Sequence, residues 1–193
     1  LTYTSVNADL NPKEDPNALN LNTEVSRKIV TFKTTPKMST YLLAICIGKF
    51  NRVSGTNQHG IEVTTYGALN QPTECLEFSN QIAMGSLDFY DQLFEVPYPL
   101  PKLDQVAIPD FDAGAMENWG LVTYRESCLL ADQNTPQTTK EYIATVVTHE
   151  LSHQWFGNLV TMRWWDNLWL NESFANMMQF YAVDHLRPEW QIW

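Results

Sequence analysis

The sequence has few cysteines, and their number and spacing exclude a disulfide-rich framework. Among its 193 residues there are three, Cys46, Cys75 and Cys128, and no Cys-x-x-Cys pair. Because three cysteines cannot all pair within one chain, free thiols in a reducing compartment are favoured over disulfides. We therefore expect a cytoplasmic protein.

Cations and long apolar runs are also scarce. Lysine and arginine number 12 against 22 aspartates and glutamates, which gives a formal net charge of -10. This balance repels nucleic acid phosphates and anionic lipids, so we expect no nucleic acid partner. It could favour a cationic substrate, although many acidic proteins bind nothing cationic. No apolar run approaches the roughly 18 residues of a membrane helix, so no membrane span is expected.

The apolar fraction, 44%, is sufficient for a sizeable core, and its periodicity predicts an α+β fold. After an expected loop to Asn22, strands are predicted at 29–33, 39–50, 61–66, 103–108 and 121–124. Helices are predicted from Pro72 to Phe94, from Pro136 to the stop at Gly157, and from about Asp166 to His185. A capping-box pattern, Thr138 to Glu141, is expected to open the second helix. The turn-rich segment 54–60 predicts a domain boundary at residue 58, and an N-terminal Leu1 suggests a piece of a longer protein.

The second predicted helix contains His149-Glu150-Leu151-Ser152-His153. Residues four apart on an α-helix lie about 40° apart around its axis, so both imidazoles can reach one ion. Neutral imidazole is a good zinc ligand, and catalytic zinc usually takes three protein ligands and keeps one position for water. Glu150, one step round the helix, is placed to take a proton from that water.

A third ligand is expected from Glu172, which follows His153 after eighteen residues. A turn and an antiparallel helix would return this carboxylate to the two histidines. The alternative is an amphipathic helix with both histidines on a solvated face. The apolar residues around the histidines argue against it, because buried histidines need partners. We therefore expect one Zn²⁺ bound by His149, His153 and Glu172.

The other histidines and the nearby tryptophans suggest no chemistry. His59 is expected in a turn and His185 near a helix end, neither with a catalytic role. Four tryptophans flank the predicted metal site, and we expect them to pack in the core because large rings bury much surface. They are Trp155, Trp164, Trp165 and Trp169.

With these motifs the chain resembles the gluzincin metallopeptidases, through His149-Glu150-x-x-His153 followed by Glu172. The segment Gly114-Ala115-Met116-Glu117-Asn118 is similar to the signature of the aminopeptidase N branch. The stretches 118–126 and 164–172 also resemble that branch, particularly its lactic-acid-bacterial members. The resemblance is densest from about Pro97 to Trp190.

The resemblance implies a zinc aminopeptidase that removes N-terminal residues from peptides. His149, His153 and Glu172 would be the ligands, and Glu150 the general base. Gly114, Ala115, Met116 and Glu117 would bind substrate, with Glu117 on its free α-ammonium. Without the resemblance, Glu117 would be an ordinary turn residue. Residues 1–58 would end an N-terminal β domain, and 59–193 would begin a truncated thermolysin-like catalytic domain.

The family also uses a downstream tyrosine to stabilise the oxyanion, and the sequence stops before it; Tyr181 lies too close behind Glu172. We therefore expect this piece alone to be poorly active. Two alternatives stay open. A relative that hydrolyses a lipid epoxide would carry Gly-Gly in place of Gly114-Ala115. A non-catalytic peptide-binding homologue would have lost a ligand or the base.

Overall fold

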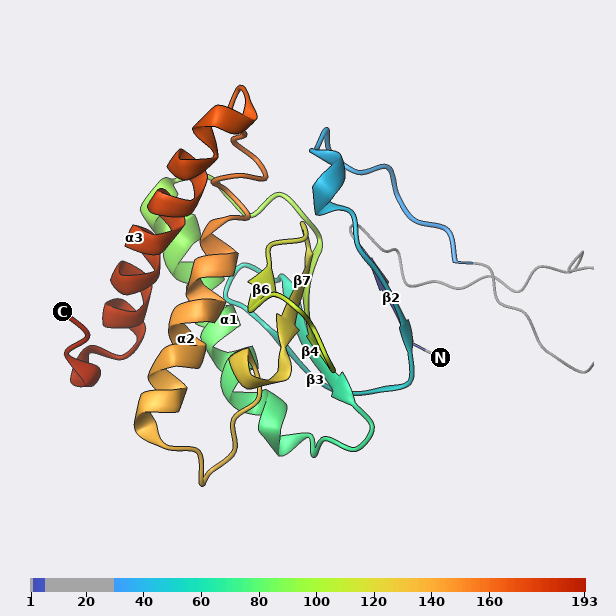
Figure 1. The fold of residues 1–193 in the computed structure, drawn as a ribbon, viewed down its shortest axis with the longest axis vertical. Coiled ribbons are helices and arrows are strands. Elements are labelled where there is room, and N and C mark those ends of the chain that lie inside the picture. The colour runs from blue at the N-terminus through green and yellow to red at the C-terminus, as the bar shows by residue number, and fades with distance from the viewer. Residues whose placement is uncertain (1, 6–29) are drawn as a thin grey trace, which may run out of the picture.

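The computed structural model of the chain describes residues 2–5 and 30–193, and within them it confirms the α+β class (Figure 1). The strands are β1 (Thr2–Ser5), β2 (Ile45–Gly48), β3 (Phe50–Thr56), β4 (Glu62–Ala68), β5 (Lys102–Ile108), β6 (Ala115–Met116) and β7 (Leu121–Arg125). The long helices are α1 (Glu74–Phe94), α2 (Gln137–Ser152) and α3 (Leu168–Leu186). Short 3-10 turns lie at Thr40–Leu42, Glu126–Cys128, Trp165–Asn167 and Pro188–Trp190.

The main sheet has five strands in the order β3-β4-β5-β7-β6. β4, β5 and β7 are parallel, and the two edge strands, β3 and β6, run antiparallel to their neighbours. Helix α1 makes the crossover between the parallel strands β4 and β5. β4 and β5 are buried along most of their length, as expected for central parallel strands covered on both faces.

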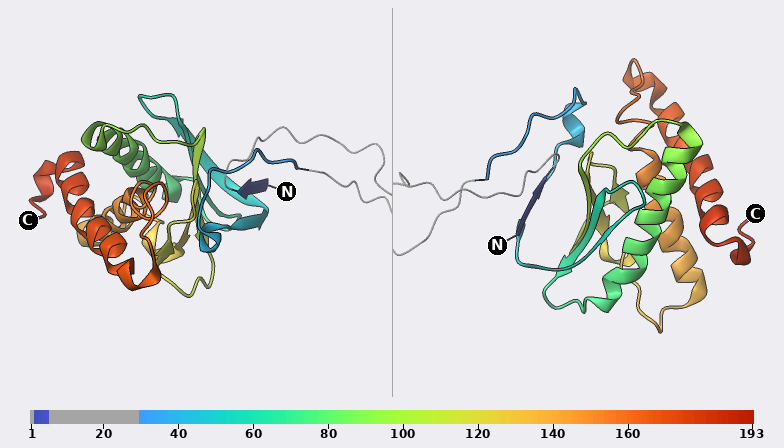
Figure 2. Two further views of the ribbon diagram at one scale, coloured as in Figure 1. Left: turned by 90° about the horizontal axis from the view of Figure 1, so that it is seen from above. Right: turned by 180° about the vertical axis from the view of Figure 1, so that it is seen from behind.

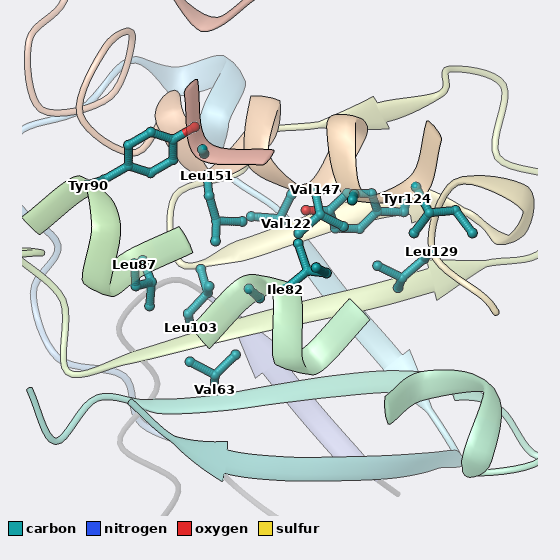
Figure 3. Close-up of a cluster of buried hydrophobic side chains, with 14 of the residues drawn as sticks. Val63, Ile82, Leu87, Tyr90, Leu103, Val122, Tyr124, Leu129, Val147 and Leu151 are labelled. Atoms are coloured by element: carbon teal, nitrogen blue, oxygen red, sulfur yellow. The ribbon is translucent and has the colours of Figure 1, made fainter. Parts of the chain in front are cut away.

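The three helices cover one face of this sheet, and the β1–β2 pair lies on the other side (Figures 1 and 2). The main core fills the space between helices and sheet (Figure 3). Its members include Val63, Ile82, Leu87, Leu103, Val122, Val147 and Leu151. On the opposite face, Tyr66, Val106 and Leu121 pack with Ala44 and Cys46, which ties the N-terminal segment to the sheet.

Helix α1 forms as the sequence predicts. Glu74 and Glu77 lie in its first turn, where carboxylates stabilise the positive end of the helix dipole. The helix ends at Phe94; the next residue, Glu95, has a left-handed φ of 54° and lies two residues before Pro97. The Tyr90 hydroxyl lies 2.9 Å from Thr148 O on α2 and 3.2 Å from Met178 O on α3, so one buried phenol contacts both other helices.

Helices α2 and α3 pack side by side and run in opposite directions, as the return of Glu172 requires (Figure 1). The expected capping box at the start of α2 is wrong. Pro136 is the N-cap residue, and its carbonyl oxygen accepts the Thr139 and Lys140 N–H groups at 3.0 and 3.1 Å. Because the helix begins at Gln137, Thr138 lies inside it rather than at the cap.

The N-terminal predictions need correction. Residues 2–5, expected as loop, form β1, which pairs with β2; the rest of that expected loop falls outside the described residues. Residues 30–33, the described part of a predicted strand, lie in no strand. The single strand predicted at 39–50 is a 3-10 turn, β2 and the start of β3, because the chain passes at Lys49 from one sheet to the other.

Residue 58 lies in the turn that joins β3 to β4, and these two strands pair over their whole length. The division into domains at this point stays a prediction. Among the described residues, no helix combines the length and the apolar character needed to cross a bilayer.

Candidate metal centre

Helix α2 brings its two histidines together at its C-terminal end. His149 lies in the last turn, and His153 follows Ser152 with helical backbone angles, φ -60° and ψ -22°. The four-residue spacing therefore keeps its helical geometry, and the two Nε2 atoms are 3.0 Å apart.

Glu172, near the start of α3, supplies the third group. Its Oε2 atom is 3.5 Å from His149 Nε2 and 3.6 Å from His153 Nε2. The three candidate ligand atoms lie within 4.8 Å of one another, and among the described residues this set meets the geometry of a metal site. The predicted solvated-face alternative fails for His153, which is 1% exposed.

The Nδ1 atom of each histidine, on the ring side away from Glu172, is held by an amide side chain. His149 Nδ1 is 2.9 Å from Gln179 Oε1, and His153 Nδ1 is 2.7 Å from Asn171 Oδ1. The Gln179 amide nitrogen donates to Asn176 Oδ1, which leaves its oxygen to face the histidine. Since amide oxygens only accept, each Nδ1 carries a proton, which leaves Nε2 as the nitrogen that faces Glu172 and can bind a metal. Two imidazole Nε2 atoms 3.0 Å apart, with the Glu172 carboxylate beside them, form a donor set that fits zinc.

A glycine allows Asn171 to reach its histidine. Gly157 has a φ of 118°, a backbone conformation that favours glycine. A Cβ at this position would lie 2.5 Å from Asn171 Oδ1, the atom that accepts from His153. The loop between α2 and α3 therefore depends on a residue without a side chain here.

Carboxylates make the site attractive to a cation. Burial lowers the pKa of His153, but the Glu172 hydrogen bond and the charges of Glu117, Glu150 and Glu172 outweigh it and raise the pKa to about 9. Hydrogen bonds from His149 and His153 hold the pKa of Glu172 well below its ordinary value. Glu172 therefore stays ionised, as a metal ligand must.

Glu150 lies outside this ligand set. It is 7% exposed, and its Oε2 atom is buried without a hydrogen-bond partner. Burial raises the pKa of Glu150 to about 8, helped by the charges of Glu117 and Glu172 and opposed by His153. A carboxyl group with a pKa near neutrality can both accept and return a proton.

The segment from Gly114 to Glu117 forms the edge of the main sheet. Ala115 and Met116 are strand β6, which pairs with β7 opposite Tyr124 and Thr123. Gly114 O accepts the Arg125 N–H at 2.9 Å. The sheet order ends at β6, so among the described strands its outer edge has no neighbour.

Glu117 follows β6 and is buried, with 7% exposure, rather than an open turn residue. The Tyr41 hydroxyl lies 3.5 Å from Glu117 Oε1, at the limit of a hydrogen bond. Burial, followed by the charge of Glu117, raises the pKa of Tyr41 to about 12, so the phenol keeps its proton and can donate. Tyr41 comes from the segment before β2, and this contact brings it to the candidate site.

Sequence reasoning missed three of these neighbours. Asn171 adjoins Glu172, and Gln179 lies seven residues beyond it, two turns along the same face of α3. Their positions relative to Glu172 on α3 could have indicated that both residues lie near the metal site. Tyr41 carried no such signal, because its approach to Glu117 depends on how distant segments pack.

The tryptophan prediction is right for one residue of four. Trp155 is 2% exposed and donates its Nε1–H to Val96 O at 2.8 Å. Trp164, Trp165 and Trp169 are 68%, 55% and 60% exposed. They lie on the loop before α3 and on its first turn, outside the main core.

Comparison with known proteins identifies similar sequences for the part of the chain that carries the site. The peptidase family M1 domain matches residues 78–193. Aminopeptidase N of Lactobacillus delbrueckii subsp. lactis is 54% identical over 163 residues, which are 84% of this chain and 19% of that protein. Aminopeptidase N of Lactococcus lactis subsp. lactis (strain IL1403) is 48% identical over 179 residues, 92% of this chain and 21% of the relative. Aminopeptidase M1 of Arabidopsis thaliana is 52% identical over 167 residues, which are 86% of this chain and 19% of that protein. The chain thus spans about a fifth of the length of these relatives.

Proposed function

Because the chain belongs to peptidase family M1, we propose that the whole protein is a zinc-dependent aminopeptidase that removes N-terminal residues from peptides. The observation that carries this proposal is the convergence of His149, His153 and Glu172, with both histidines oriented by amide oxygens. The names of the relatives support the same reaction class. A cytoplasmic location is part of the proposal.

His149, His153 and Glu172 would hold the ion. Zinc in such a site lowers the pKa of a bound water and polarises a carbonyl oxygen. Gln179 and Asn171 would fix the rings so that both Nε2 atoms stay directed at the metal. Glu150 would take a proton from the attacking water and return it to the departing amine, for which its raised pKa is suited.

The substrate backbone would lie against the outer edge of β6. An extended peptide can add to such an edge through main-chain hydrogen bonds, which hold it without demanding a particular side chain. Gly114, Ala115 and Met116 supply this edge. The peptide would then end at Glu117, where a buried carboxylate pairs with the free α-ammonium.

Tyr41 would occupy one oxygen of the Glu117 carboxylate, and the other oxygen would be available to bind the substrate. Its hydroxyl lies at Glu117 Oε1, so Oε2 is the oxygen free to accept from the ammonium. Glu172, whose charge also reaches Tyr41, adds to the negative potential at this end of the site. The negative charge of this region thus has a specific use, recognition of a cationic N-terminus.

Glu117→Ala in the full-length protein is expected to lower kcat/KM on free-amine peptides by about ten- to a hundredfold, because a charge-assisted contact contributes roughly 1.5–3 kcal/mol. Steady-state kinetics on a tripeptide with a free N-terminus measure this effect. Glu77→Ala, which removes an exposed carboxylate from α1, is the matched control and should keep wild-type kinetics. Unchanged kinetics in Glu117→Ala, or a loss explained by a lower melting temperature, would mean that Glu117 only supports its loop.

A further inference from the structure

Two buried amide side chains from the segment just after α2 hold the backbone of Glu117. Gln154 Nε2 donates to Glu117 O at 3.2 Å, and Asn158 Nδ2 donates to the same oxygen at 2.9 Å. Both side chains belong to residues with at most 1% exposure. The carbonyl that carries the candidate amine-binding residue is therefore fixed from two sides.

These amides are themselves tied to the metal-binding segment. Asn158 N–H donates to His153 O at 3.1 Å, and Gln154 directly follows His153. Gln154 Oε1 also accepts the Gly120 N–H at 3.0 Å, so its amide bridges the backbone on both sides of Trp119. A continuous chain of short contacts thus joins the metal ligands to the Glu117 segment.

This connection matters because an aminopeptidase must cut after one residue. The distance from the ammonium-binding carboxylate to the metal has to match one amino acid, and a slip by one residue moves the backbone by about 3.3–3.6 Å. A displacement of about 1 Å can already cost a hundredfold in rate. Anything that fixes this distance therefore contributes to the position of the cut.

We propose that Gln154 and Asn158 are positioning residues that set the spacing between Glu117 and the metal ligands, and thereby restrict cleavage to the first peptide bond. The inference rests on the proposed aminopeptidase function. Neither side chain contacts the candidate ligand atoms; both donate to the Glu117 carbonyl, and Gln154 also contacts Gly120 N–H and, at 3.3 Å, Glu150 O. Their side chains differ in this from those of Asn171 and Gln179, which hold the histidines.

The test uses the full-length protein with Asn158→Asp and Gln154→Glu. Each substitution keeps the size of the side chain but places an oxygen against the Glu117 carbonyl, while Gln154→Glu still accepts from Gly120. The matched control is Gln137→Glu, an exposed position in the first turn of α2. On a free-amine tetrapeptide, both test variants should lose about ten- to a hundredfold in kcat/KM. Mass spectrometry should show dipeptides among their products, whereas wild type and control release single residues. Zinc content should stay at one per chain.

A thermodynamic cycle with Glu117→Ala separates positioning from a general loss of structure. If the amides act through Glu117, adding Asn158→Asp or Gln154→Glu to Glu117→Ala should lower kcat/KM by less than threefold further. Full additivity, unchanged product lengths, or unfolding of both single variants would each overturn the inference. If one variant fails to fold, the other gives the result. A wild-type protein inactive on every free-amine peptide would instead refute the proposed function.

Discussion

Replacing Glu150 with glutamine in the full-length protein is expected to lower kcat by about a hundred- to ten-thousandfold, the usual contribution of a general base. Glutamine has the same shape as glutamate but cannot take a proton from water. Glu150 lies outside the set formed by His149, His153 and Glu172, so zinc content should remain at one per chain. Steady-state kinetics and elemental analysis of the same sample measure both quantities.

The control for this experiment is Glu141→Gln, the same substitution earlier on α2, where the carboxylate accepts an exposed hydrogen bond from Gln137. It should keep wild-type activity. Loss of zinc together with activity in Glu150→Gln would show that Glu150 supports the metal site rather than the proton transfer. Wild-type kcat in Glu150→Gln would remove it from the mechanism altogether.

His153→Ala is expected to abolish stoichiometric zinc binding and to lower kcat/KM by about a thousandfold or more. Loss of a residue that only orients a ligand costs roughly ten- to a hundredfold in metal affinity or activity, and loss of a ligand should exceed this. The substitution also removes a buried ring and the Nδ1–H group that donates to Asn171 Oδ1. Zinc content by elemental analysis, after dialysis against a weak chelator, is the primary measurement.

His185→Ala is the matched control, since His185 is an exposed histidine on α3 that packs against Phe89, away from the site. It should retain one zinc per chain and full activity. If His153→Ala also kept one zinc per chain under these conditions, the ligand assignment would be wrong.

The metal site could be predicted from sequence because its geometry is local. The four-residue spacing of His149 and His153 places both rings on one face of any helix, and a short return brings Glu172 back. The helices themselves follow from apolar periodicity and proline stops. The structure confirms α1 and α3 within two residues of their predicted bounds, whereas α2 ends at Ser152, five residues before the predicted stop at Gly157. The resemblance to the aminopeptidase N branch is likewise confirmed, with lactic acid bacteria among the relatives.

The features that sequence reasoning missed depend on contacts between distant segments. Glu117 is buried and Tyr41, from the segment before β2, approaches it; no local pattern encodes either feature. Trp164, Trp165 and Trp169 have the composition of a core but lie exposed in the part of the protein described here. Hydrophobicity predicts that a side chain prefers burial; it does not identify the surface that buries it.

The most direct measurement compares two forms of one peptide, identical except for an acetyl group on the N-terminus, with the zinc-loaded full-length protein. The free peptide should lose one residue at a time from its N-terminus if, as proposed, Glu117 pairs with the ammonium and Glu150 acts on the first peptide bond. The acetylated peptide should remain intact, because it lacks the charge and adds bulk where the carboxylate ends the site. Equal cleavage of both peptides would contradict the proposed aminopeptidase.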